Sequence, residues 1–378
     1  MTVLRSSAPP TQRTAAPTSP PGQDGLDLRW VRQQVDAVMN AFVDRKKSAA
    51  TRAGLPVDIP QAIGEFLAAG GKRIRPLLCV LGWHAAGASG SPAQAVQAGA
   101  ALEMFHAFCL IHDDVMDHSD TRRGQPAVHR SLAARHRSGR SRALAENIGI
   151  GSAILAGDLA LVWSDELLHH AATELTAARR ERVLPLVDLM RAEVMYGQYL
   201  DLTSTGRPTA HTAAALEIIR YKTAKYTIER PLQIGAAIAG ADDQLLDALS
   251  AFALPLGDAF QLRDDLLGVF GTQKKTGKPA VDDLREGKHT VLIALALQLA
   301  DPFQQRLLRS LYGTPRLDEE GAATVRTVLK ATGADQAVEQ MITNRYEQAL
   351  PLLDTLPIPT EVQHHLRALA DQAVWRTA

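Results

Sequence analysis

Apolar residues recur at helical spacing along most of this chain, and the alternation typical of strands is hard to find from Leu26 onward. The first helix is predicted over residues 28–43, where the apolar positions are Trp30, Val31, Val35, Val38, Met39 and Phe42. A second helix is predicted after Pro60, and Pro76 suits the first turn of a third, where proline is tolerated. Further helices are predicted from near Pro92 to 117 and over 145–170, 178–200, 212–239, 243–269, 290–299, 303–311, 319–331, 334–353 and 360–375. We therefore expect an all-α bundle.

The segments without helical periodicity divide the chain. Residues 1–25 are rich in Pro, Ser and Thr with little to bury, so we expect a disordered tail ahead of a single domain over residues 26–378. The segments 203–209 and 271–279 contain Gly and Pro and are predicted loops. The basic segment 118–142, which contains Gly and Ser, is predicted to be a mobile loop.

The composition excludes several classes of protein. Of the 378 residues 46% are hydrophobic, and 41 Lys and Arg balance 41 Asp and Glu. Such a chain can bury a substantial core, whereas a general nucleic-acid binder would carry a basic domain. Cys79 and Cys109 lie in apolar runs, so we expect reduced, buried thiols. No apolar stretch approaches the roughly 20 residues of a membrane span, and the first residues lack the apolar segment of a secretory signal, so we expect a cytoplasmic protein.

The sequence AFCLIHDDVMDHSD, residues 107–120, places three carboxylates after an apolar run without a helix breaker. At about 3.6 residues per turn, Asp113 and Asp117 lie on one helix face. Like charges at this spacing destabilise a helix by roughly a few tenths of a kcal/mol, and a helix C-terminus disfavours anions further. A divalent cation would reverse both effects. Oxygen ligands without nearby Cys or paired His indicate Mg²⁺.

A second acidic pair occurs in FQLRDDLLG, residues 260–268, where Asp264 and Asp265 end an apolar run and Gln261 lies one turn before them. A single acidic cluster on a helix is more often a solvated face than a site. Two clusters, each embedded in apolar helix, are harder to explain in that way. We therefore predict that two facing helices bracket one polynuclear metal site, whose simplest ligand is a diphosphate.

A diphosphate also needs fixed cations, and basic residues occur at suitable positions. The segment GGKRIRP, residues 70–76, contains Lys72, Arg73 and Arg75, although a solvated turn is the alternative interpretation. Arg122 and Arg123 follow the first acidic cluster, and the arginine fork suits phosphate oxygens. Four lysines flank the second half of the predicted site: Lys222, Lys225, Lys278 and Lys288. His106, two turns before Asp113, fits either a ligand-binding group or an ordinary core histidine.

Six motifs follow one another in the order GGKRIRP, EMFHAFCLIHDDVMD, TRRGQPAVH, YKTA, FQLRDDLLG and GKPAVDDLREGKHT. In these motifs, over about residues 50–300, the chain resembles the trans-isoprenyl diphosphate synthases, or polyprenyl synthetases, and among them bacterial geranylgeranyl diphosphate synthases. The resemblance implies an isoprenoid-synthase-type helical bundle around a central cavity, assembled as a homodimer. It also implies Mg²⁺-dependent, head-to-tail condensation of isopentenyl diphosphate with dimethylallyl, geranyl or farnesyl diphosphate.

The resemblance assigns a role to each matching residue. The implied ligands of about three Mg²⁺ ions are Asp113, Asp117 and Asp264, with Asp114 and Asp265 in support. The allylic diphosphate would be held by Arg122, Lys222 and Lys278. The pocket for isopentenyl diphosphate would comprise Lys72, Arg75, His106 and Arg123. Thr223 and Gln261 match positions near the reacting centre. The implied chemistry is ionisation of the allylic C–O bond, attack by the second substrate's double bond and loss of a proton, without a side-chain nucleophile.

One position departs from the family pattern. The second motif of many members is DDxxD, whereas Gly268 stands here at the fifth position. We interpret this as a subgroup variant, since the flanking residues are complete, with weaker Mg²⁺ affinity or altered substrate preference as the hypothesis.

Product length would be set by the side chain that blocks the growing tail. Phe108 lies five residues before Asp113, about 7.5 Å along the helix axis, with the small Cys109 beside it and Phe105 nearly another turn deeper. One aromatic residue at this position, without an insertion in DDVMD, resembles enzymes that stop at geranylgeranyl diphosphate. A C20 product is therefore predicted. The alternative is that Phe108 is ordinary core packing.

Three other functions remain open at this stage. A farnesyl diphosphate synthase would share the chemistry and differ only in product length. A class I terpene cyclase would share the fold, the metal and diphosphate ionisation, but has little use for the second diphosphate pocket implied by GGKRIRP, His106 and Arg123. A non-catalytic subunit of a prenyl synthase would be expected to have lost acidic ligands, and the first cluster is intact.

Overall fold

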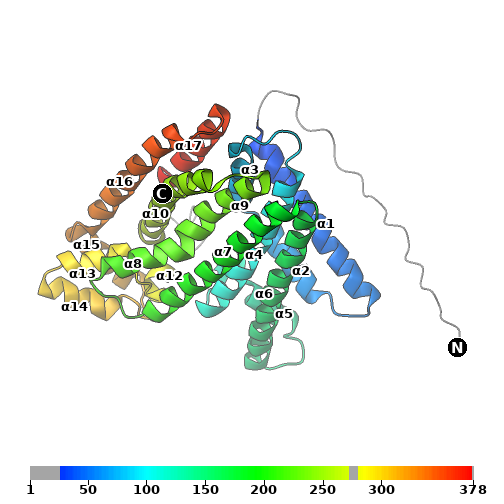
Figure 1. Ribbon diagram of the computed structural model, residues 1–378. Helices are drawn as coiled ribbons and strands as arrows, with labels where there is room; N and C mark the ends of the chain where they lie inside the picture. The colour runs from blue at the N-terminus through cyan, green and yellow to red at the C-terminus, as the bar shows by residue number, and fades with distance from the viewer. Residues whose placement is uncertain (1–25, 272–279, 377–378) are drawn as a thin grey trace.

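The computed structural model describes residues 26–271 and 280–376. Its first half contains α1 (Leu28–Arg52), α2 (Asp58–Ala68), α3 (Ile74–Ala85), α4 (Ala93–Met116), β1 (Thr121–Arg122), β2 (Gln125–Pro126), α5 (Val128–Arg135), α6 (Arg142–Thr173) and α7 (Ala177–Ser204). Its second half contains α8 (Thr212–Ile219), η1 (Arg220–Glu229), α9 (Arg230–Ala239), α10 (Asp243–Phe270), α12 (Ala280–Glu286), α13 (Val291–Leu299), α14 (Pro302–Leu311), α15 (Glu319–Ala331), α16 (Ala334–Thr355) and α17 (Thr360–Val374). The all-α prediction is confirmed (Figure 1).

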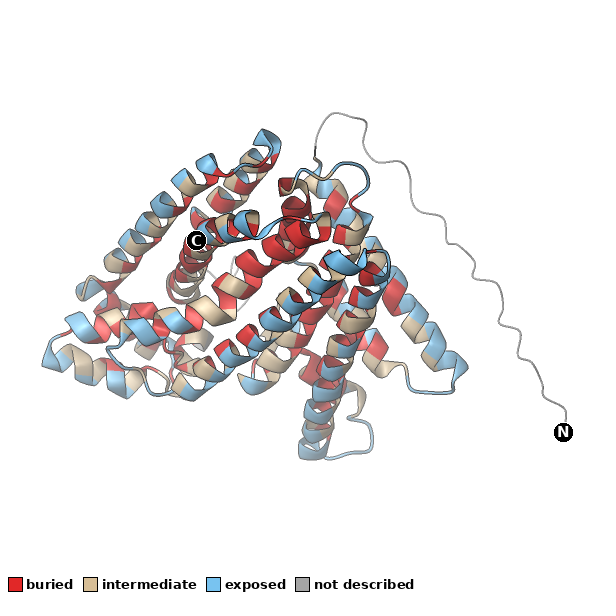
Figure 2. Ribbon diagram, viewed as in Figure 1, coloured by how far each residue is buried: buried red, intermediate tan, exposed pale blue. Residues whose placement is uncertain are grey.

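Buried apolar side chains form two clusters. One is built mainly from α1 to α7 and the other mainly from α8 to α17. The helices between the clusters, α3 and α9, are among the most completely buried (Figure 2). They approach backbone to backbone, because a Cβ atom on Gly82 would lie 2.0 Å from the Leu232 carbonyl oxygen and one on Gly235 would lie 1.7 Å from that of Cys79. Glycine at these two positions thus permits the central contact of the bundle.

The run 212–239, predicted as one helix, is continuous but changes type. Its middle, η1, is a π-helix, a wider form that is rare and often found at functional sites. Glycines of two neighbouring helices make room for it. A Cβ on Gly197 of α7 would lie 2.4 Å from the backbone nitrogen of Lys222, and one on Gly257 of α10 would lie 2.5 Å from the Ala224 Cα. The spacing of residues in the sequence therefore does not predict the direction in which each side chain of η1 points.

The prediction of a loop over residues 118–142 is wrong. The hairpin β1–β2 pairs Thr121 with Pro126 and Arg122 with Gln125, and the two turn residues both have positive φ, Arg123 at 54° and Gly124 at 73°. Two-residue hairpin turns favour this backbone because it matches strand twist. The helix α5 follows. It packs closely against α6 at Gly149, where a Cβ would lie 2.3 Å from the His129 carbonyl oxygen. Tertiary packing therefore orders a segment that local composition marks as a loop.

Other differences are smaller. The helix α2 begins at Asp58, before Pro60, and α3 begins at Ile74, so that Pro76 lies within its first turn. The helix α12 was not predicted. By length and composition alone, α6 and α10 could each cross a membrane, with 33% of the apolar window of α6 and 61% of that of α10 buried in the protein. Core helices of soluble proteins commonly pass this test, so it is weak as an indicator of a span.

Candidate active site

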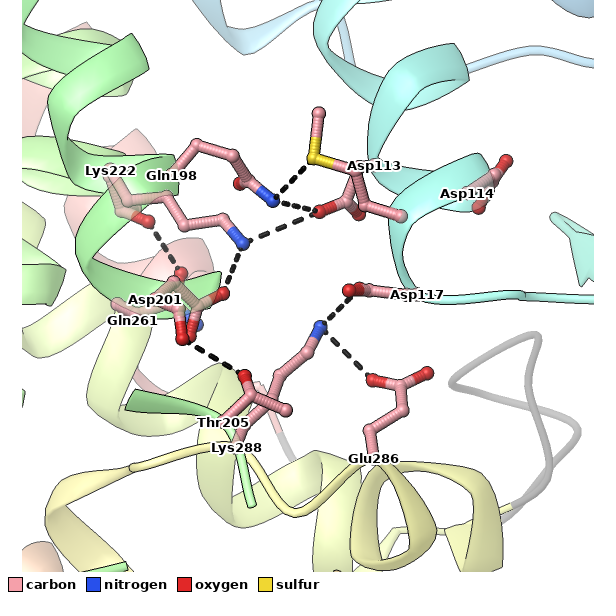
Figure 3. Close-up of polar contacts among 12 residues, drawn as sticks. Asp113, Asp114, Asp117, Gln198, Asp201, Thr205, Lys222, Gln261, Glu286 and Lys288 are labelled. Carbon is pink, nitrogen blue, oxygen red and sulfur yellow. Dashed lines mark hydrogen bonds and ion pairs between the residues drawn. The ribbon is translucent and has the colours of Figure 1, made fainter. Parts of the chain in front are cut away.

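The first acidic cluster lies at the C-terminal end of α4, where Asp113 occupies the last turn and Asp117 is the C-cap. Three cations from other elements contact it, of which Figure 3 shows Lys222 and Lys288. The Lys222 Nζ of η1 lies 3.3 Å from Asp113 Oδ1, Arg122 Nη2 lies 3.0 Å from Asp113 Oδ2, and Lys288 Nζ lies 2.8 Å from Asp117 Oδ2. The repulsion between Asp113 and Asp117 that the sequence predicts is therefore offset by these three cationic side chains.

Arg122 is held by the adjacent carboxylate. Its Nε donates to Asp114 Oδ1 at 2.8 Å, and the Asp114 side chain is fully buried. Burial lowers the pKa of Arg122, but the charges of Asp114 and Asp113 outweigh this effect and raise it. Asp114 is thus turned away from the space between Asp113 and Asp117, in keeping with the predicted supporting role.

Lys222 is held by a residue that sequence reasoning missed. Its Nζ lies 2.5 Å from Oδ2 of Asp201, which is 6% exposed near the end of α7. Gln198, one turn earlier, donates to Asp113 Oδ1 at 3.2 Å. Burial lowers the pKa of Lys222, but Asp113 and Asp201 raise it above its ordinary value. A single carboxylate in an amphipathic helix gives little sequence signal, so only the fold identifies Asp201.

Lys288, which the sequence places only as a residue flanking the site, pairs directly with the first acidic cluster. It follows α12 and contacts both Asp117 and Glu286, whose Oε2 lies 3.0 Å away. Burial lowers the pKa of Lys288, but Asp117 and Asp113 raise it well above its ordinary value. Lys225 differs, because its Nζ contacts Glu193 at 2.7 Å, outside this cluster. Lys278 lies outside the described residues.

A chain of hydrogen bonds joins η1 to α10. Thr223 Oγ1 donates to Gln261 Oε1 at 2.8 Å, and Gln261 Nε2 donates to Asp265 Oδ1 at 2.8 Å. Asp265, Gln261 and Thr223 line a cavity of about 100 Å³ together with Asp201, Lys222 and Lys288. Burial raises the pKa of Asp265 to about 7, with smaller contributions from the charges of Asp264, Asp201 and Asp283. Asp265 thus faces the charged cluster.

Asp264 points in a different direction from Asp265. It forms an ion pair with Arg376 near the end of the chain, and it does not line the cavity that contains Asp265. Burial raises the pKa of Asp264, while the charges of Arg376 and Lys72 lower it. The helix α10 places adjacent carboxylates about 100° apart, which explains why only one of the pair faces Lys222. Of the two carboxylates of the second cluster, Asp265 is therefore the one that lies next to Lys222 and Lys288 in this structure.

The basic segment 70–76 separates into different environments. Lys72 lines a cavity of about 320 Å³ with Arg32 and Arg376, and burial lowers its pKa. Arg73 is buried and pairs with Glu103 at 2.7 Å and Asp36 at 2.8 Å, so it holds the fold. Arg75 lies 4.1 Å from the centroid of the Tyr226 ring and lines a different cavity. The three basic residues therefore do not share one environment.

His106 and Arg123 make different contacts. His106 Nδ1 is 3.1 Å from the Tyr226 hydroxyl, and burial, followed by the charge of Arg75, lowers the pKa of His106 well below its ordinary value. His106 is therefore neutral at pH 7. Arg123 donates to the Gly70 carbonyl and stacks on Phe66 at 5.5 Å, which joins the hairpin to segment 70–76.

A mostly apolar cavity of about 350 Å³ extends below the charged cluster. The cavity is lined by Asp113 and Lys222 together with Phe108, Cys109, His106 and Arg75. Its outer side is formed by α7 side chains, namely Val194, Met195, Gln198, Tyr199 and Leu202. Phe105 is not on this lining: it is 1% exposed and packs behind Phe108, with ring centroids 5.3 Å apart. The structure thus brings charged groups and an apolar cavity together.

The chain is similar to known proteins over most of its length. The chain matches the model of the Polyprenyl synthetase family over residues 58–331. A crystal structure of geranylgeranyl pyrophosphate synthase from Corynebacterium glutamicum, complexed with isoprenyl diphosphate and magnesium, is 42% identical, with a TM-score of 0.88 over 93% of this chain and 100% of that one. The family match contains every residue that the sequence predicts for the site.

Two curated relatives have similar coverage. The geranylgeranyl diphosphate synthase of Sulfolobus acidocaldarius is 30% identical over 311 residues, which is 81% of this chain and 87% of that protein. The geranylfarnesyl diphosphate synthase of Aeropyrum pernix is 32% identical over 321 residues, which is 82% of this chain and 92% of that protein. The similarity therefore extends over most of both chains.

Proposed function

Because the chain belongs to the polyprenyl synthetase family and is a trans-prenyltransferase, we propose that it condenses isopentenyl diphosphate with dimethylallyl, geranyl or farnesyl diphosphate, and that its main product is geranylgeranyl diphosphate. One observation carries the proposal. Asp113 and Lys222 belong both to the charged cluster and to the lining of the apolar cavity. Such a site suits a substrate with a diphosphate head and a hydrocarbon tail.

The carboxylates of the first cluster fit a divalent metal. Asp113 and Asp117 offer hard oxygen ligands one turn apart. Asp265 lines a cavity with Lys222 and Lys288 of the same charged cluster. We assign the metal ligation to Asp113 and Asp117, and to Asp264 by family resemblance, with Mg²⁺ as the ion and about three ions as the number. Asp264 would have to release Arg376 to take part. When bound, the metal supplies Lewis acidity that stabilises negative charge on the departing diphosphate.

The protein cations position the two diphosphates. We assign Arg122, Lys222 and Lys278 to the allylic diphosphate, because Arg122 and Lys222 border the first cluster. We assign Lys72, Arg75, His106 and Arg123 to isopentenyl diphosphate by family resemblance, and Lys72 would have to turn from its own cavity toward Arg75 to take part. Neutral His106 can donate a hydrogen bond without adding charge, while Arg75 supplies the charge beside it. Preorganised cations of this kind stabilise developing negative charge at little reorganisation cost.

Thr223 and Gln261 lie close to the reacting centre in this proposal. Their hydrogen bond fixes η1 against α10, and Lys222 precedes Thr223 on η1. The cationic intermediate would therefore form beside oxygen atoms of Thr223 and Gln261 and above the apolar cavity. The mostly apolar lining of the cavity would disfavour water, which would otherwise capture a carbocation.

Phe108 supports the proposed C20 length. It lines the cavity, and its ring packs on Phe105 behind it and on His112, at 4.8 Å between ring centroids. A side chain supported on two sides can stop a growing tail, whereas the small Cys109 beside it leaves space. We infer that Phe108 is the residue that ends elongation.

We also propose a homodimer in the cytoplasm. Large exposed apolar side chains gather on two helices: Leu144, Ile150, Ile154, Leu155 and Val162 on α6, and Leu184, Leu189, Met195, Tyr196, Tyr199 and Leu202 on α7. A second copy is the partner that would cover this face, since isologous dimers bury the same patch of both subunits. Sedimentation analysis of the protein and of Val162→Glu tests this: a dimer that the substitution dissociates is expected, and a wild-type monomer would contradict it.

The experiment that tests the reaction measures incorporation of labelled isopentenyl diphosphate into extractable prenyl diphosphate. Product is expected only when Mg²⁺ and an allylic diphosphate are both present, and excess EDTA should abolish it. Conversion of an allylic diphosphate to hydrocarbon without isopentenyl diphosphate would indicate a terpene cyclase. No turnover under any condition would favour a non-catalytic subunit.

A further inference from the structure

The ring of His112, near the end of α4, lies in a niche that Gly157 forms in the neighbouring helix α6. A Cβ atom on Gly157 would lie 2.2 Å from both Cδ2 and Nε2 of the His112 ring. Gly157 is buried in the interior of α6, where alanine would stabilise a helix more than glycine does. The stability of the helix alone therefore does not favour glycine at this position, whereas the place of the His112 ring requires it.

A hydrogen bond to α6 holds the ring in this niche. Nε2 of His112 donates to the Ile154 carbonyl oxygen at 3.0 Å. A carbonyl oxygen has two lone pairs, so it can accept this bond in addition to a hydrogen bond of the helix. Oδ1 of Asp158, a largely exposed carboxylate, lies 3.6 Å from the same nitrogen. The helix α6 thus fixes both the distance and the direction of the His112 ring.

The same ring supports Phe108. The centroids of the two rings lie 4.8 Å apart, and their planes cross at 67°, which is the edge-to-face arrangement that such pairs favour. Phe105 supports Phe108 from another position on α4, with ring centroids 5.3 Å apart. Phe108 and His112 both line the apolar cavity, whereas Gly157 does not. The His112 ring therefore connects α6 to the side chain that we propose ends elongation.

Resting on the proposed function, we propose that Gly157 helps to determine product length from outside the cavity, because it sets the place of the His112 ring, which holds Phe108 in the path of the growing tail. Gly157 is then a positioning residue that acts through His112 and contacts no substrate. A larger residue at 157 would turn the ring out of its niche and leave Phe108 without this support. The tail could then displace Phe108 and grow further.

The packing around Gly157 implies that the ring would move rather than the helices. On the same face of α6, Ala153, Ala156 and Ala160 have no exposed surface, and Ile111 beside His112 has none either. Close-packed helices of this kind resist separation. The His112 ring, in contrast, is the end of a side chain that can change rotamer. A methyl group at 157 should therefore displace the ring while the fold is kept.

The test is product analysis of the full chain with Mg²⁺, isopentenyl diphosphate and dimethylallyl diphosphate, read as the ratio of products longer than the main wild-type product to that product. Gly157→Ala should raise this ratio about fivefold, the effect expected from the loss of one contact between rings. His112→Ala should raise it at least as much. Adding Gly157→Ala to His112→Ala should change it no further, since the new Cβ then meets no ring. The matched control is Gly151→Ala on the same helix, where a Cβ would meet nothing within 4 Å and the wild-type ratio is expected.

A wild-type ratio in Gly157→Ala would overturn the inference, as would additive effects of Gly157→Ala and His112→Ala or an equal rise in Gly151→Ala. A variant that is only less stable would lose rate without a change in this ratio. Circular dichroism checks folding, and His112→Gln, which removes the ring, replaces a variant that does not fold and should raise the ratio likewise. A wild-type protein that makes no prenyl diphosphate would overturn the proposed function and this inference with it. Prenyl diphosphate of any length from wild type, with that length kept in Gly157→Ala, would overturn this inference alone.

Discussion

The charged rim of the site and the apolar floor beneath it are held together by different forces. We use charged rim for Asp113, Asp117, Arg122, Lys222 and Lys288, and apolar floor for Phe108, Cys109 and the α7 side chains Val194, Met195, Tyr199 and Leu202. Each carboxylate of the rim that binds metal in our proposal is also paired with a cation from another element. The floor has no such pairing, and its Phe108 ring is supported by packing on Phe105 and His112 of the same helix, α4.

This difference separates two properties of the enzyme. In our proposal the charged groups of the rim act on the charge that develops in the transition state, so their loss should reduce the rate. The proposal also has the side chains of the floor touch only the hydrocarbon tail, so their loss should change where elongation stops. Substitutions in the two regions should therefore affect rate and product length independently.

The largest effect is expected from Asp113→Ala. This carboxylate contacts Lys222, Arg122 and Gln198, and its loss removes a proposed metal ligand. We expect kcat/KM to fall about 10³-fold or more, equivalent to about 4 kcal/mol, with the residual product unchanged in length. Steady-state condensation assays with product analysis measure both quantities. Asp120→Ala is the control, because it removes only an exposed ion pair with Arg130.

Lys222→Met should have the next largest effect. It removes a cation from the rim and leaves Asp201 buried without this partner, so we expect kcat/KM to fall about 10²-fold. Lys225→Met, three residues along η1, is the matched control. Glu193 retains Arg230 at 2.8 Å in that variant, so kcat/KM should stay within about threefold of wild type. Equal losses in both lysine variants would mean that η1 acts only through its fold.

Phe108→Ala should act on length rather than rate. We expect products longer than C20, with the rate of the first condensation within about threefold of wild type and a loss of about 3 kcal/mol of unfolding free energy. Chromatography of dephosphorylated products and denaturant unfolding give the two results. Phe105→Leu, behind Phe108 and outside the cavity lining, is the control and should keep the wild-type length. A C20 product from Phe108→Ala would show that the floor lies elsewhere.

His106 joins the two regions and should give the smallest effect. Burial and Arg75 lower its pKa in the native state, so the unfolded chain binds a proton first as the pH falls. Since extra protons on the unfolded state favour unfolding, this residue costs stability below its ordinary pKa of about 6.5. Between pH 7.5 and 5.5, His106→Gln should lose about 1 kcal/mol less unfolding free energy than wild type. Denaturant unfolding at both pH values decides this, and parallel losses would contradict it.

The sequence predicts most of the helices and the first acidic cluster, because both follow from local spacing. Helical periodicity gives the ends of α15 to the residue and most others to within a few residues. The i, i+4 relation of Asp113 and Asp117 survives folding for the same reason.

Properties that depend on neighbours in space were not predictable. The hairpin β1–β2 and α5 are ordered by packing on α6, and the π-helix η1 requires glycines of α7 and α10. Asp201 and the orientation of Asp264 toward Arg376 depend on residues far away in the chain. A single buried partner such as Asp201 belongs to no periodic pattern or motif in the sequence, whereas Lys222, with which it pairs, belongs to one.

The most direct test of the whole account is the chain length of the product formed from Mg²⁺, isopentenyl diphosphate and each of the dimethylallyl, geranyl and farnesyl primers in turn. A rim that accepts any allylic diphosphate above a floor fixed at Phe108 predicts one dominant C20 diphosphate from all three primers. A dominant C15 product, or a length that changes with the primer, would contradict a floor at that residue.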